Sequence, residues 1–540
     1  MSDLFLGLDC STQGLTAVLI DSRQEIYRNS INFDIDLPHY KTQSGVIVLG
    51  DPKIVHSNPL MWVEALELLF EKLIYDDIQI KNVKVISGSG QQHGTIYLND
   101  KFERVLQNLN PKKSLIKQIK DTLTRQTSPI WMDSSTTKQC VDIRKKLGGM
   151  EKTIKITGSN TFERFSGPQI SKYHKENLEA YKKTSIIHLV SSFMASILLG
   201  KNAPIDHGDG AGMNLMNIKT KHWDERALEA TAPELKEKLP PLCNPCDIIG
   251  NISPYFVEKY CFSSDTILIA WSGDNPNSLI GVGLTEKGKA AISLGTSDTY
   301  FGYMQELFLD LNGEGHVFGA PTGDYMSLIC FKNGSLAREK VKNKFELTWN
   351  EFSELLTKTP PGNHGKIMLP YFFTEIVPLV LEPKVYRFGL DMDDVEGNVR
   401  AIIEAQFLSM RLHSSWIGEK PNEIYATGGA SANKEILQVA ANIFNTPIRK
   451  FEITDSAGLG AALRAMKFYF DSIGNKKRWN EIGFKLIQNQ YSEIIEPENT
   501  YTQLYNDMLM LYKKCEEFIL KKGIELEPYR TEFIKKHFKS

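Results

Sequence analysis

Residues 268–299 read LIAWSGDNPNSLIGVGLTEKGKAAISLGTSDT, and the rest of the chain is organised around them. They contain two short apolar runs, residues 268–271 and 290–294, and each run ends in a tight polar turn. We expect both to be β-strands that deliver a turn with functional groups.

The two turns suit different tasks. The second, GTSDT, offers backbone N–H groups and hydroxyls with little side-chain bulk, which suits a phosphate. The first, SGDNP, places the carboxylate of Asp274 beside the amide of Asn275, pinned by Pro276, which suits a hydroxyl that is to be deprotonated. A phosphate-binding turn and a base only about twenty residues apart predict phosphoryl transfer.

A similar hairpin opens the chain. An apolar strand at residues 4–8 ends at Asp9, and the turn CSTQG, residues 10–14, leads into a second strand at 15–20. Here the turn N–H groups would face an anion and Asp9 would hold Mg²⁺ through water. Hairpin turns also contain Asp, Ser and Gly for conformational reasons, so this hairpin alone leaves both interpretations open. Its recurrence about 285 residues later predicts two related halves, with a nucleotide in the cleft between them.

Three further stretches of the first half carry candidate ligand-binding groups. The strand at residues 83–86 runs into SGSGQQHG, whose Gln92 and His93 could bond a polyhydroxylated molecule beyond the carboxyl end of a sheet, although His93 could also be a satisfied loop histidine. Asp133, in WMDSS, is either the cap of a helix at residues 136–147 or an aspartate of a pocket. Arg164 stands between two aromatic residues that could sandwich its guanidinium, although a surface arginine is the commoner case.

In the second half, a strand at residues 424–427 is followed by Gly428, Gly429 and Ala430. Strand, Gly-Gly and helix allow a planar or anionic ligand to approach the backbone closely, and we expect Ser431 to cap the helix at 433–444. Gly-Gly turns also serve plain geometry.

Other stretches predict packing or mobility rather than a site. Residues 455–462, DSAGLGAA, open another helix with mostly small residues, which suits close helix packing. Residues 206–214, DHGDGAGMN, predict a flexible polar loop. Residues 283–290 nearly match a P-loop, but Ala290 has no hydroxyl and a strand follows, so we reject that interpretation.

Length, composition, charge and cysteine content limit the classes of protein that this chain can belong to. With 540 residues we expect two or more large domains. Hydrophobic residues make up 41% and charged residues 24%, as in ordinary globular proteins, and 63 Lys+Arg against 65 Asp+Glu leave no basic field for nucleic acid or anionic lipid. No secretory signal or membrane span is apparent, so we expect a cytoplasmic protein with no nucleic-acid or membrane partner. The seven cysteines are scattered around one C-x-x-C at residues 243–246, which favours incidental thiols over a metal site.

The order of these motifs carries a family resemblance. Residues 9–12, 295–299 and 428–430 resemble the two phosphate loops and the adenosine loop of the actin-like ATPases. With QQH, WMD and GDNP added, residues 5–470 resemble the FGGY family of carbohydrate kinases. The runs LPHYKTQSGV, SGSGQQHG, WMDSSTT, SGDNPNSL, SLGTSDT, FKNGS and ATGGASANKEILQ are most similar to the xylulokinases of the animal type.

Two stretches depart from the family pattern. TEIVP, residues 374–378, stands where many members have Gly-Glu-Arg-x-Pro. Ser134-Ser135 stand where bacterial members often carry arginine. Both favour the animal-type subgroup.

The resemblance implies an α/β fold of two ribonuclease-H-like domains flanking a deep catalytic cleft. Residues 1–262 would bind the sugar and carry the first phosphate loop, residues 263–475 would bind ATP and carry the base, and residues 476–540 would form a helical extension on the second domain. The implied reaction is ATP-dependent phosphorylation of D-xylulose to D-xylulose 5-phosphate, with ATP and Mg²⁺, in a monomer or homodimer.

The resemblance also implies a role for each candidate residue. Asp274 is the base, and Asp9 orients Mg²⁺ through water. The sugar-binding residues are Gln92, His93, Asp133, Arg164, Asp274 and Asn275. The ATP-binding residues are Thr12, Gly295, Thr296, Ser297, Trp349, Gly429, Ala430 and Asn433, although a tryptophan placed like Trp349 is more often core.

Two other functions stay open at this point. One is a kinase of another sugar or polyol, such as ribulose, glycerol or gluconate. The other is an actin-like ATPase that is not a kinase, which would have no need of Asp274 and Asn275 after a strand. A chaperone of that fold would also need a peptide-binding domain, and only about 65 residues follow the second half.

Overall fold

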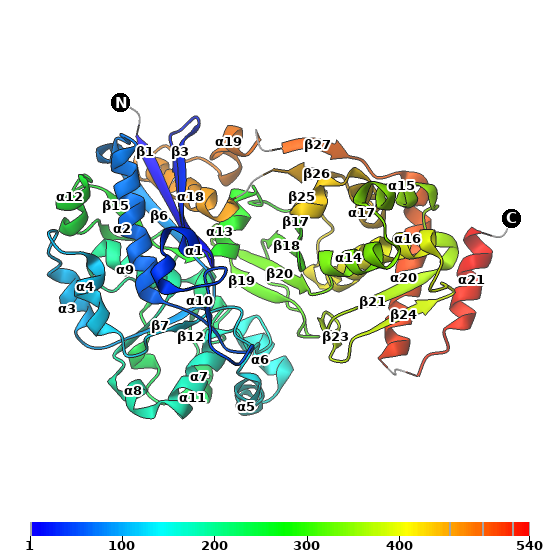
Figure 1. Ribbon diagram of the computed structural model, residues 1–540, viewed down its shortest axis with the longest axis horizontal. Coiled ribbons are helices and arrows are strands. Elements are labelled where there is room, and N and C mark those ends of the chain that lie inside the picture. The colour runs from blue at the N-terminus through cyan, green and yellow to red at the C-terminus, as the bar shows by residue number, and fades with distance from the viewer. Residues whose placement is uncertain (1–2, 453–454, 489–490, 521–522, 539–540) are drawn as a thin grey trace.

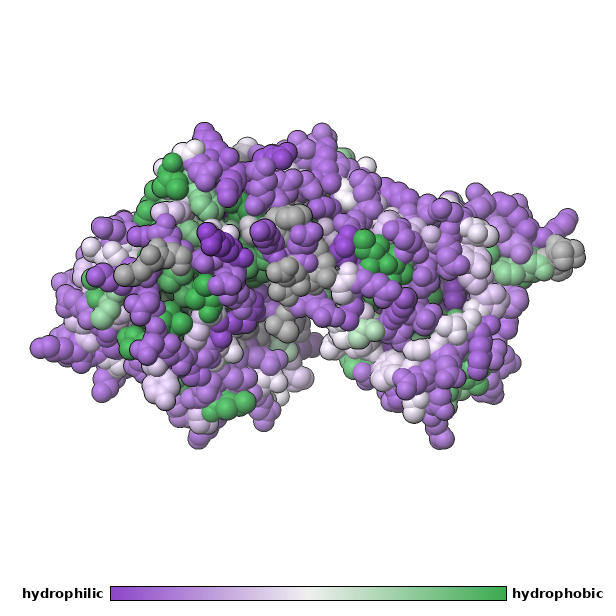
Figure 2. All heavy atoms as spheres, turned by 90° about the horizontal axis from the view of Figure 1, so that it is seen from above, coloured by the Kyte–Doolittle hydropathy of each residue, from purple (hydrophilic) through white to green (hydrophobic). Residues whose placement is uncertain are grey.

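The computed structural model describes residues 3–452, 455–488, 491–520 and 523–538. Its elements form two lobes, each built on a seven-stranded mixed sheet (Figure 1). Figure 2 shows a largely hydrophilic face, with hydrophobic residues in separate small patches and an indented outline between the lobes. Within the described ranges, no helix has both the length and the apolar character that crossing a membrane requires.

The first sheet combines a meander with parallel strands. β1 pairs with β2 antiparallel and with β6 parallel, and β15 and β16 are parallel to β6. In sheet order the strands are β14 (Ile248–Asn251), β15 (Ile267–Ile269), β6 (Val83–Gly90), β1 (Leu4–Cys10), β2 (Gly14–Ile20) and β3 (Glu25–Asn32), with β16 (Ser272–Gly273) beside β6.

The second sheet repeats this plan. β17 pairs with β18 antiparallel and with β25 parallel, and β26 is parallel to β25. In sheet order the strands are β19 (His316–Gly319), β20 (Tyr325–Phe331), β18 (Asp298–Met304), β17 (Lys289–Leu294), β25 (Glu423–Thr427), β26 (Ile448–Phe451) and β27 (Tyr491–Ile495). The prediction of two related α/β halves, each opening with a hairpin, is confirmed.

The end of the first half differs from the expected position. The sequence starts the second domain at residue 263, but β15 and β16 both pair with β6 in the first sheet. The first sheet therefore extends to Gly273, and helix α13 (Asp274–Gly281) begins at its edge. Sequence could not locate this end, because β16 is two residues long and pairs with a strand about 180 residues earlier.

One helix of the second half returns to the first sheet. α18 (Ser456–Ser472) follows β26 and packs on β1, β6 and α13 (Figure 1). A Cβ added at Gly7 would lie 2.2 Å from the carbonyl oxygen of Gly458, and one at Gly460 would lie 1.9 Å from that of Asn277. The close packing predicted from the small residues of this helix is confirmed, and glycine is required on both sides of the contact.

The two faces of the first sheet bury different cores. Leu4, Leu6 and Leu8 share a cluster with residues of α2 (Pro59–Tyr75) and α9 (Val190–Leu199). The alternate residues of the same strands, such as Phe5 and Val18, belong to the cluster that continues through α13 and α18 into the second lobe. This alternation follows from the two-residue repeat of a strand.

The C-terminal part of the chain rests on the second lobe. α20 (Thr502–Ile519) contacts α16 (Val395–His413) and α17 (Lys434–Phe444), and β27 extends the sheet beside β26. The tail is therefore a strand as well as helices, which the expectation of a purely helical extension did not include. α21 (Glu527–His537) ends the described chain at the far side of this lobe (Figure 1).

Candidate active site

Three strands of the first sheet deliver polar residues to one edge. Cys10 of β1 and Gly273 of β16 both lie opposite Gly90 of β6. Because all three strands are parallel, the residues around these positions lie side by side. Asp9 and Asp274 are thereby brought to the same edge of the sheet.

Asp274 is the first residue of α13, directly after Gly273. Its Oδ1 accepts a bond from the backbone N–H of Asn275 at 2.9 Å and one from Asn275 Nδ2 at 3.1 Å. The backbone N–H groups of Gln92 and of Asp274 itself also act on this carboxylate. Burial raises the pKa of Asp274 to about 6, against the lowering effect of the backbone N–H bonds. The group is an ionised carboxylate at neutral pH, with a pKa suited to accepting a proton.

Asn275 and Gln92 form a pair beside this carboxylate. Asn275 Nδ2 donates to Gln92 Oε1 at 2.8 Å, which leaves Asn275 Oδ1 and Gln92 Nε2 without a described partner. A Cβ added at Gly273 would lie 2.4 Å from the Gln92 side chain, so glycine is needed for this approach. The structure brings Gln92, Asp274 and Asn275 together.

His93 follows Gln92 in the left-handed region, with φ of 73°. Its Nδ1 lies 2.9 Å from the carbonyl oxygen of Gly212, which can only accept, so the ring carries its proton on Nδ1 and offers Nε2 as an acceptor. Burial and the nearby Arg164 lower the pKa of His93 to about 3. The imidazole is neutral and able to accept a hydrogen bond from a hydroxyl, and it lies against Phe165, with 4.5 Å between ring centres and the rings tilted by 32°.

Arg164 lies against two neighbouring aromatic rings, whose centres are 5.7 Å apart, and is not sandwiched between them as the sequence had suggested. Its guanidinium carbon lies 5.4 Å from the ring centre of Phe162 and 5.9 Å from that of Phe165. The same Phe165 ring contacts His93, so both predicted sugar ligands share one wall. The alternative of an ordinary surface arginine does not describe this side chain, because Arg164 is half-buried and donates to His316 at 2.8 Å.

Asp133 lies inside the wall rather than on its surface. Oδ1 accepts from Ser135 N, Ser135 Oγ and Gln169 Nε2, and Oδ2 accepts from Val55 N. Burial alone raises the pKa of Asp133, but these bonds and His56 outweigh it and hold the pKa below its ordinary value. Asp133 does not cap the following helix, because the N-cap of α5 (Thr137–Leu147) is Thr136. Its oxygens are engaged by protein donors.

Asp9 is the buried carboxylate nearest the first phosphate loop. Its Oδ1 has no hydrogen-bond partner in the structure. Burial raises its pKa, as do Asp455 and Asp274, against a bond from Ser89. A buried acidic oxygen without a donor, next to two further carboxylates, fits a cation that completes its shell with water and phosphate oxygens.

The first phosphate loop is fixed by a tryptophan. Trp131 Nε1 donates to Thr12 Oγ1 at 2.8 Å, and Thr12 Oγ1 donates to Gln91 Oε1 at 3.3 Å. The Thr12 hydroxyl is thus oriented from both sides, and this loop meets the wall that carries Asp133.

The second phosphate loop lies between β17 and β18. Thr296 and Ser297 are exposed at its tip, and Gly295 precedes them. The next residue, Asp298, is buried and takes two bonds from Arg338, at 2.7 and 3.0 Å. A charged pair beneath the loop therefore fixes a tip whose own groups stay free.

The departure at residues 374–378 supports the same loop. Glu375 accepts from the backbone N–H of Lys332 at 2.9 Å and that of Asn333 at 3.0 Å. Glu375 thereby holds the turn that contains Gly334. This turn lies close to Asp298, since a Cβ added at Gly334 would be 2.8 Å from the backbone nitrogen of Asp298.

The candidate nucleoside loop follows β25. Gly428 has φ of 89°, and a Cβ there would lie 2.6 Å from the Leu294 carbonyl oxygen, whereas nothing lies within 4 Å of one at Gly429. Gly429 and Ala430 belong to a short 3-10 helix, η7 (Gly429–Ala432). Because Ser293 of β17 lies opposite Thr427 of β25, this loop and the second phosphate loop are neighbours.

Asn433, not Ser431, caps α17. Asn433 Oδ1 accepts from the N–H groups of Glu435 and Ile436, and its Nδ2 donates to Ser353 Oγ at 2.5 Å. Ser431 instead donates to the Gly428 carbonyl oxygen. Ser353 lies one turn after Trp349 on α15 (Trp349–Lys358), so Trp349 and Asn433 are on neighbouring helices. Trp349 is 43% exposed and is not a core residue.

Sequence reasoning missed one group of acidic residues. The stretch expected to be a flexible loop contains a buried helix, α10 (His207–Ala211), capped by Asp206. Asp209 accepts a 2.5 Å bond from Ser191, and burial, Asp206 and Asp274 raise its pKa. The Asp-x-x-Asp spacing among glycines was the available signal, since an aspartate at an N-cap bonds the N–H three residues later.

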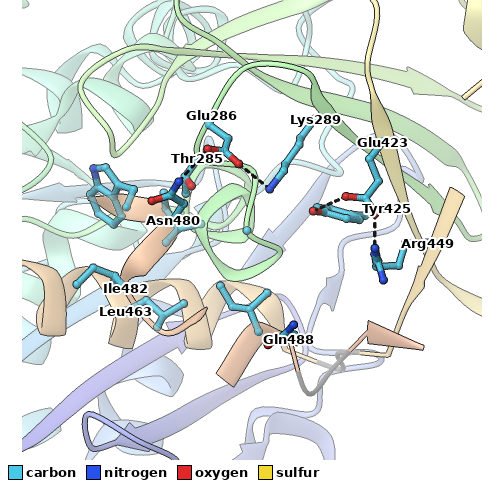
Figure 3. A pocket seen from close by; sticks show the side chains of 14 residues that line it. Thr285, Glu286, Lys289, Glu423, Tyr425, Arg449, Leu463, Asn480, Ile482 and Gln488 are labelled. Atoms are coloured by element: carbon cyan, nitrogen blue, oxygen red, sulfur yellow. Dashed lines mark hydrogen bonds and ion pairs between the residues drawn. The ribbon is translucent and has the colours of Figure 1, made fainter. Parts of the chain in front are cut away.

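A separate pocket of about 410 Å³ lies away from these groups (Figure 3). It is lined by the first residues of β17 and β25, Lys289 and Glu423, whereas the phosphate and nucleoside loops follow the last residues of the same strands. Its charges are paired, with Lys289 at 2.8 Å from Glu286 and Arg449 at 2.6 Å from Glu423. None of the candidate site residues lines this pocket.

Among known proteins, the chain is similar to several that are named as xylulose kinases. A xylulose kinase of Rattus norvegicus is 40% identical over 530 residues, covering 96% of this chain and 97% of the relative. Xylulose kinase 2 of Arabidopsis thaliana is 45% identical over 486 residues, 86% of each chain. A crystal structure of a ligand-bound xylulose kinase from Lactobacillus acidophilus shares the fold, with a TM-score of 0.79 and 22% identity over 96% of this chain and 98% of that one.

The family models match both halves. Residues 4–281 match the N-terminal domain of the FGGY family of carbohydrate kinases, and residues 290–468 match its C-terminal domain. The protein described here belongs to the FGGY family of carbohydrate kinases.

Proposed function

We propose that this protein transfers the γ-phosphoryl group of ATP to D-xylulose and releases D-xylulose 5-phosphate and ADP. The observation that carries the proposal is the carboxylate of Asp274, with a pKa of about 6, beside the Gln92–Asn275 pair and on the same sheet edge as Asp9. The names of relatives 40 and 45% identical support the choice of xylulose.

Asp274 acts as the general base in this proposal. Its carboxylate takes the proton of the terminal hydroxyl as that oxygen attacks the γ-phosphorus. Such a base contributes modestly, since positioning and charge neutralisation dominate phosphoryl transfer.

The sugar is held by groups of complementary character. His93 offers Nε2 as an acceptor, Arg164 offers only donors, and Asn275 offers its Oδ1. An open-chain ketose with hydroxyl and carbonyl oxygens needs both kinds. We propose that Asp133 acts at this site through the wall that it holds together, because its oxygens already accept four bonds.

ATP is held by the second lobe and the first hairpin. Gly295, Thr296, Ser297 and the Thr12 loop bind the phosphates with backbone N–H groups and hydroxyls. Gly429 and Ala430 admit the nucleoside to the backbone. Mg²⁺, when bound, neutralises charge on the phosphate oxygens, and Asp9 is the residue that would hold it through water.

The base of the nucleotide has its own contacts. We propose that Trp349 packs against the adenine and that Asn433 borders it. The exposed indole and the bond from Asn433 to the same helix support this arrangement.

Further features of the proposal concern the whole molecule. Residues 1–273 with α18 form the sugar-binding unit, and the second sheet with α14 (Ser335–Lys344) to α17 and the tail forms the ATP-binding unit. The cleft closes when both substrates bind, which keeps water from competing as the acceptor. The protein works in the cytoplasm as a monomer or homodimer.

ADP release from the purified protein tests the function. MgATP is supplied with D-xylulose, D-ribulose, glycerol, gluconate and a hexose in parallel, and ATP hydrolysis without a sugar sets the baseline. We expect D-xylulose to give the highest kcat/KM and the baseline to be slow. A preference for another member of the panel would replace the substrate while keeping the kinase, and equal ADP release without any sugar would remove the kinase function.

A further inference from the structure

Arg164 of the first lobe bonds a residue of the second. Arg164 lies in the loop between α6 (Met150–Thr157) and α7 (Ser166–Glu176). His316 is the first residue of β19, the edge strand of the second sheet. Arg164 Nη2 and His316 Nε2 are 2.8 Å apart. A predicted sugar ligand is therefore oriented by a residue that is about 150 positions later in the chain.

The chemistry of this bond fixes the state of the histidine. A guanidinium can only donate, so His316 Nε2 must accept and the ring proton must sit on Nδ1. The ring is fully buried between aromatic neighbours, 4.5 Å from Phe162 and 5.3 Å from Phe165 between centres. Burial lowers the pKa of His316 well below its ordinary value, and the neighbouring Arg164 lowers it further. His316 is a neutral acceptor throughout the neutral range.

Arg164 has no acidic partner to orient it. In the described part of the chain, no carboxylate lies within ion-pair distance of this guanidinium. Its positive charge is therefore not neutralised, and its remaining N–H groups are not engaged. The neutral acceptor His316 can orient the guanidinium of Arg164 through one N–H group, while the other N–H groups stay available to a ligand.

The strand that carries His316 is itself fixed against the first lobe. The N–H of Val317 donates to Ser159 Oγ at 3.4 Å, and a Cβ at Gly158 would lie 3.0 Å from the Val317 carbonyl oxygen. At the other end of the strand, a Cβ at Gly319 would lie 2.9 Å from the His207 backbone. Backbone contacts on both sides place the imidazole with little freedom.

We propose that His316 is a positioning residue for the sugar, which holds Arg164 so that its free N–H groups face the acceptor oxygens of a polyhydroxylated ketone. The inference rests on the proposed function, in which Arg164 contacts the sugar. It adds that the second lobe, otherwise assigned to ATP, completes the sugar site through a strand that packs against the first lobe.

Variants of His316 separate this role from a structural one. His316→Phe keeps an aromatic ring among Phe162, Phe165 and Phe318 but removes the acceptor. His316→Gln can place its amide oxygen near the position of Nε2, whereas His316→Asn places it near Nδ1. The measurements are the KM for the accepted sugar, the KM for ATP, kcat and the melting temperature.

We expect His316→Phe and His316→Asn to raise the sugar KM about tenfold, as for loss of a hydrogen bond to a charged group, with kcat and the ATP KM changed less than about twofold. His316→Gln should recover most of the sugar KM. In an Arg164→Ala background, which itself has a raised sugar KM, His316→Phe should add nothing.

The outcomes distinguish the inference from the function beneath it. If Arg164→Ala raises the sugar KM and His316→Phe does not, or if the two effects simply add, the inference is wrong and the proposed function stands. If Arg164→Ala leaves the sugar KM unchanged, Arg164 is not a sugar ligand, and the inference falls with that assignment. Should His316→Phe fold poorly, the Gln and Asn variants still decide, because equal sugar KM values for these two would contradict a role for Nε2.

Discussion

Asp9 and Asp274 leave the first sheet on either side of the same strand, β6. Cys10, next to Asp9, and Gly273, next to Asp274, both lie opposite Gly90. Two carboxylates are therefore held near each other by backbone pairing alone, and the charge of Asp274 contributes to the raised pKa of Asp9. A site of this kind favours a cation between the acids and leaves one of them able to accept a proton.

The first prediction concerns Asp274 as the base. Asp274→Ala should abolish sugar phosphorylation and leave ATP binding nearly unchanged. In the wild type the carboxyl must be ionised, so kcat/KM should be constant above pH 7 and fall as pH drops through about 6, approaching tenfold per pH unit. The measurement is a pH series of kcat/KM with saturating MgATP.

Asp265→Asn is the matched control, because Asp265 is exposed on the loop before β15. This variant should keep the wild-type pH profile. Substantial sugar turnover in Asp274→Ala would exclude Asp274 as the base, and a flat profile between pH 5 and 8 would contradict the assigned pKa.

The second prediction is that Asp9→Asn raises the stability of the ligand-free protein at high pH and lowers its phosphorylation rate. The pKa of this carboxyl is raised in the folded protein, so the folded state favours the protonated form, and ionised Asp9 costs stability as pH rises above about 4. Without Mg²⁺, Asp9→Asn should therefore melt higher than the wild type at pH 8 and differ little at pH 4.5. Its phosphorylation rate should be at least tenfold lower, because the amide holds the cation poorly.

Thermal scans with and without Mg²⁺ and ATP check this prediction. MgATP should raise the melting temperature of the wild type more than that of Asp9→Asn. A variant that is less stable than the wild type at pH 8, in the absence of ligands, would show that Asp9 has a structural role instead.

The strand and turn structure of the candidate phosphate loops was predictable from sequence because it is specified locally. A turn of Gly, Ser and Thr between two apolar runs already specifies a strand, a small-residue loop and a strand, at residues 10–14 and again at 295–299. The Gly-Gly turn after β25 predicted a close approach of the backbone to a ligand, whereas the close contact that the structure shows at Gly428 is with the carbonyl oxygen of Leu294, at a φ of 89°.

The groups that position α13 and Arg164 were not predictable, because their partners are remote in sequence. Arg464 of α18 donates to Asn277 at 2.9 Å and to the Ala270 carbonyl oxygen at 2.8 Å, and so links α13 to the strand before it. The role of His316 could not be predicted for the same reason, because its partner Arg164 lies 152 residues earlier in the chain. For Asp133 the motif was recognisable from sequence, but the orientation of its side chain was not. Its oxygens face the interior of the wall, where Ser135 and Gln169 donate to Oδ1.

The third prediction concerns the pair beneath the second phosphate loop. Arg338 and Asp298 are each 1% exposed, and Arg338 Nη1 also donates to Gln406 at 2.8 Å. Arg338→Met leaves a buried carboxylate without its cation, which should lower the free energy of unfolding by about 3–5 kcal/mol. The loop tip should also lose its support, so the KM for ATP should rise more than that for the sugar.

Chemical denaturation and steady-state kinetics check this prediction. The double variant Arg338→Met/Asp298→Asn removes the unpaired charge and should recover more than half of the lost stability. If the double variant is no more stable than Arg338→Met, the cost lies in packing around Arg338 rather than in the charge of Asp298.

The last prediction concerns the docking of the C-terminal helices at high pH. His413 of α16 lies 2.8 Å from Glu314 and 3.1 Å from Glu516 of α20. Burial alone would lower the pKa of His413, but the bonds to these two carboxylates outweigh it and raise the pKa to about 10. Since the unfolded value is about 6.5, the stabilisation is complete below pH 6.5 and is lost as pH rises through about 10. The free energy of unfolding should therefore drop by a few kcal/mol between pH 7 and pH 10.5 in the wild type, relative to His413→Gln, which lacks the titrating group.

His222→Gln is the control, because His222 is exposed and, among the described residues, its side chain bonds the nearby carbonyl oxygen of Thr220; this variant should follow the wild type. A wild type and a His413→Gln variant with parallel pH profiles would show that the imidazolium does not hold the tail.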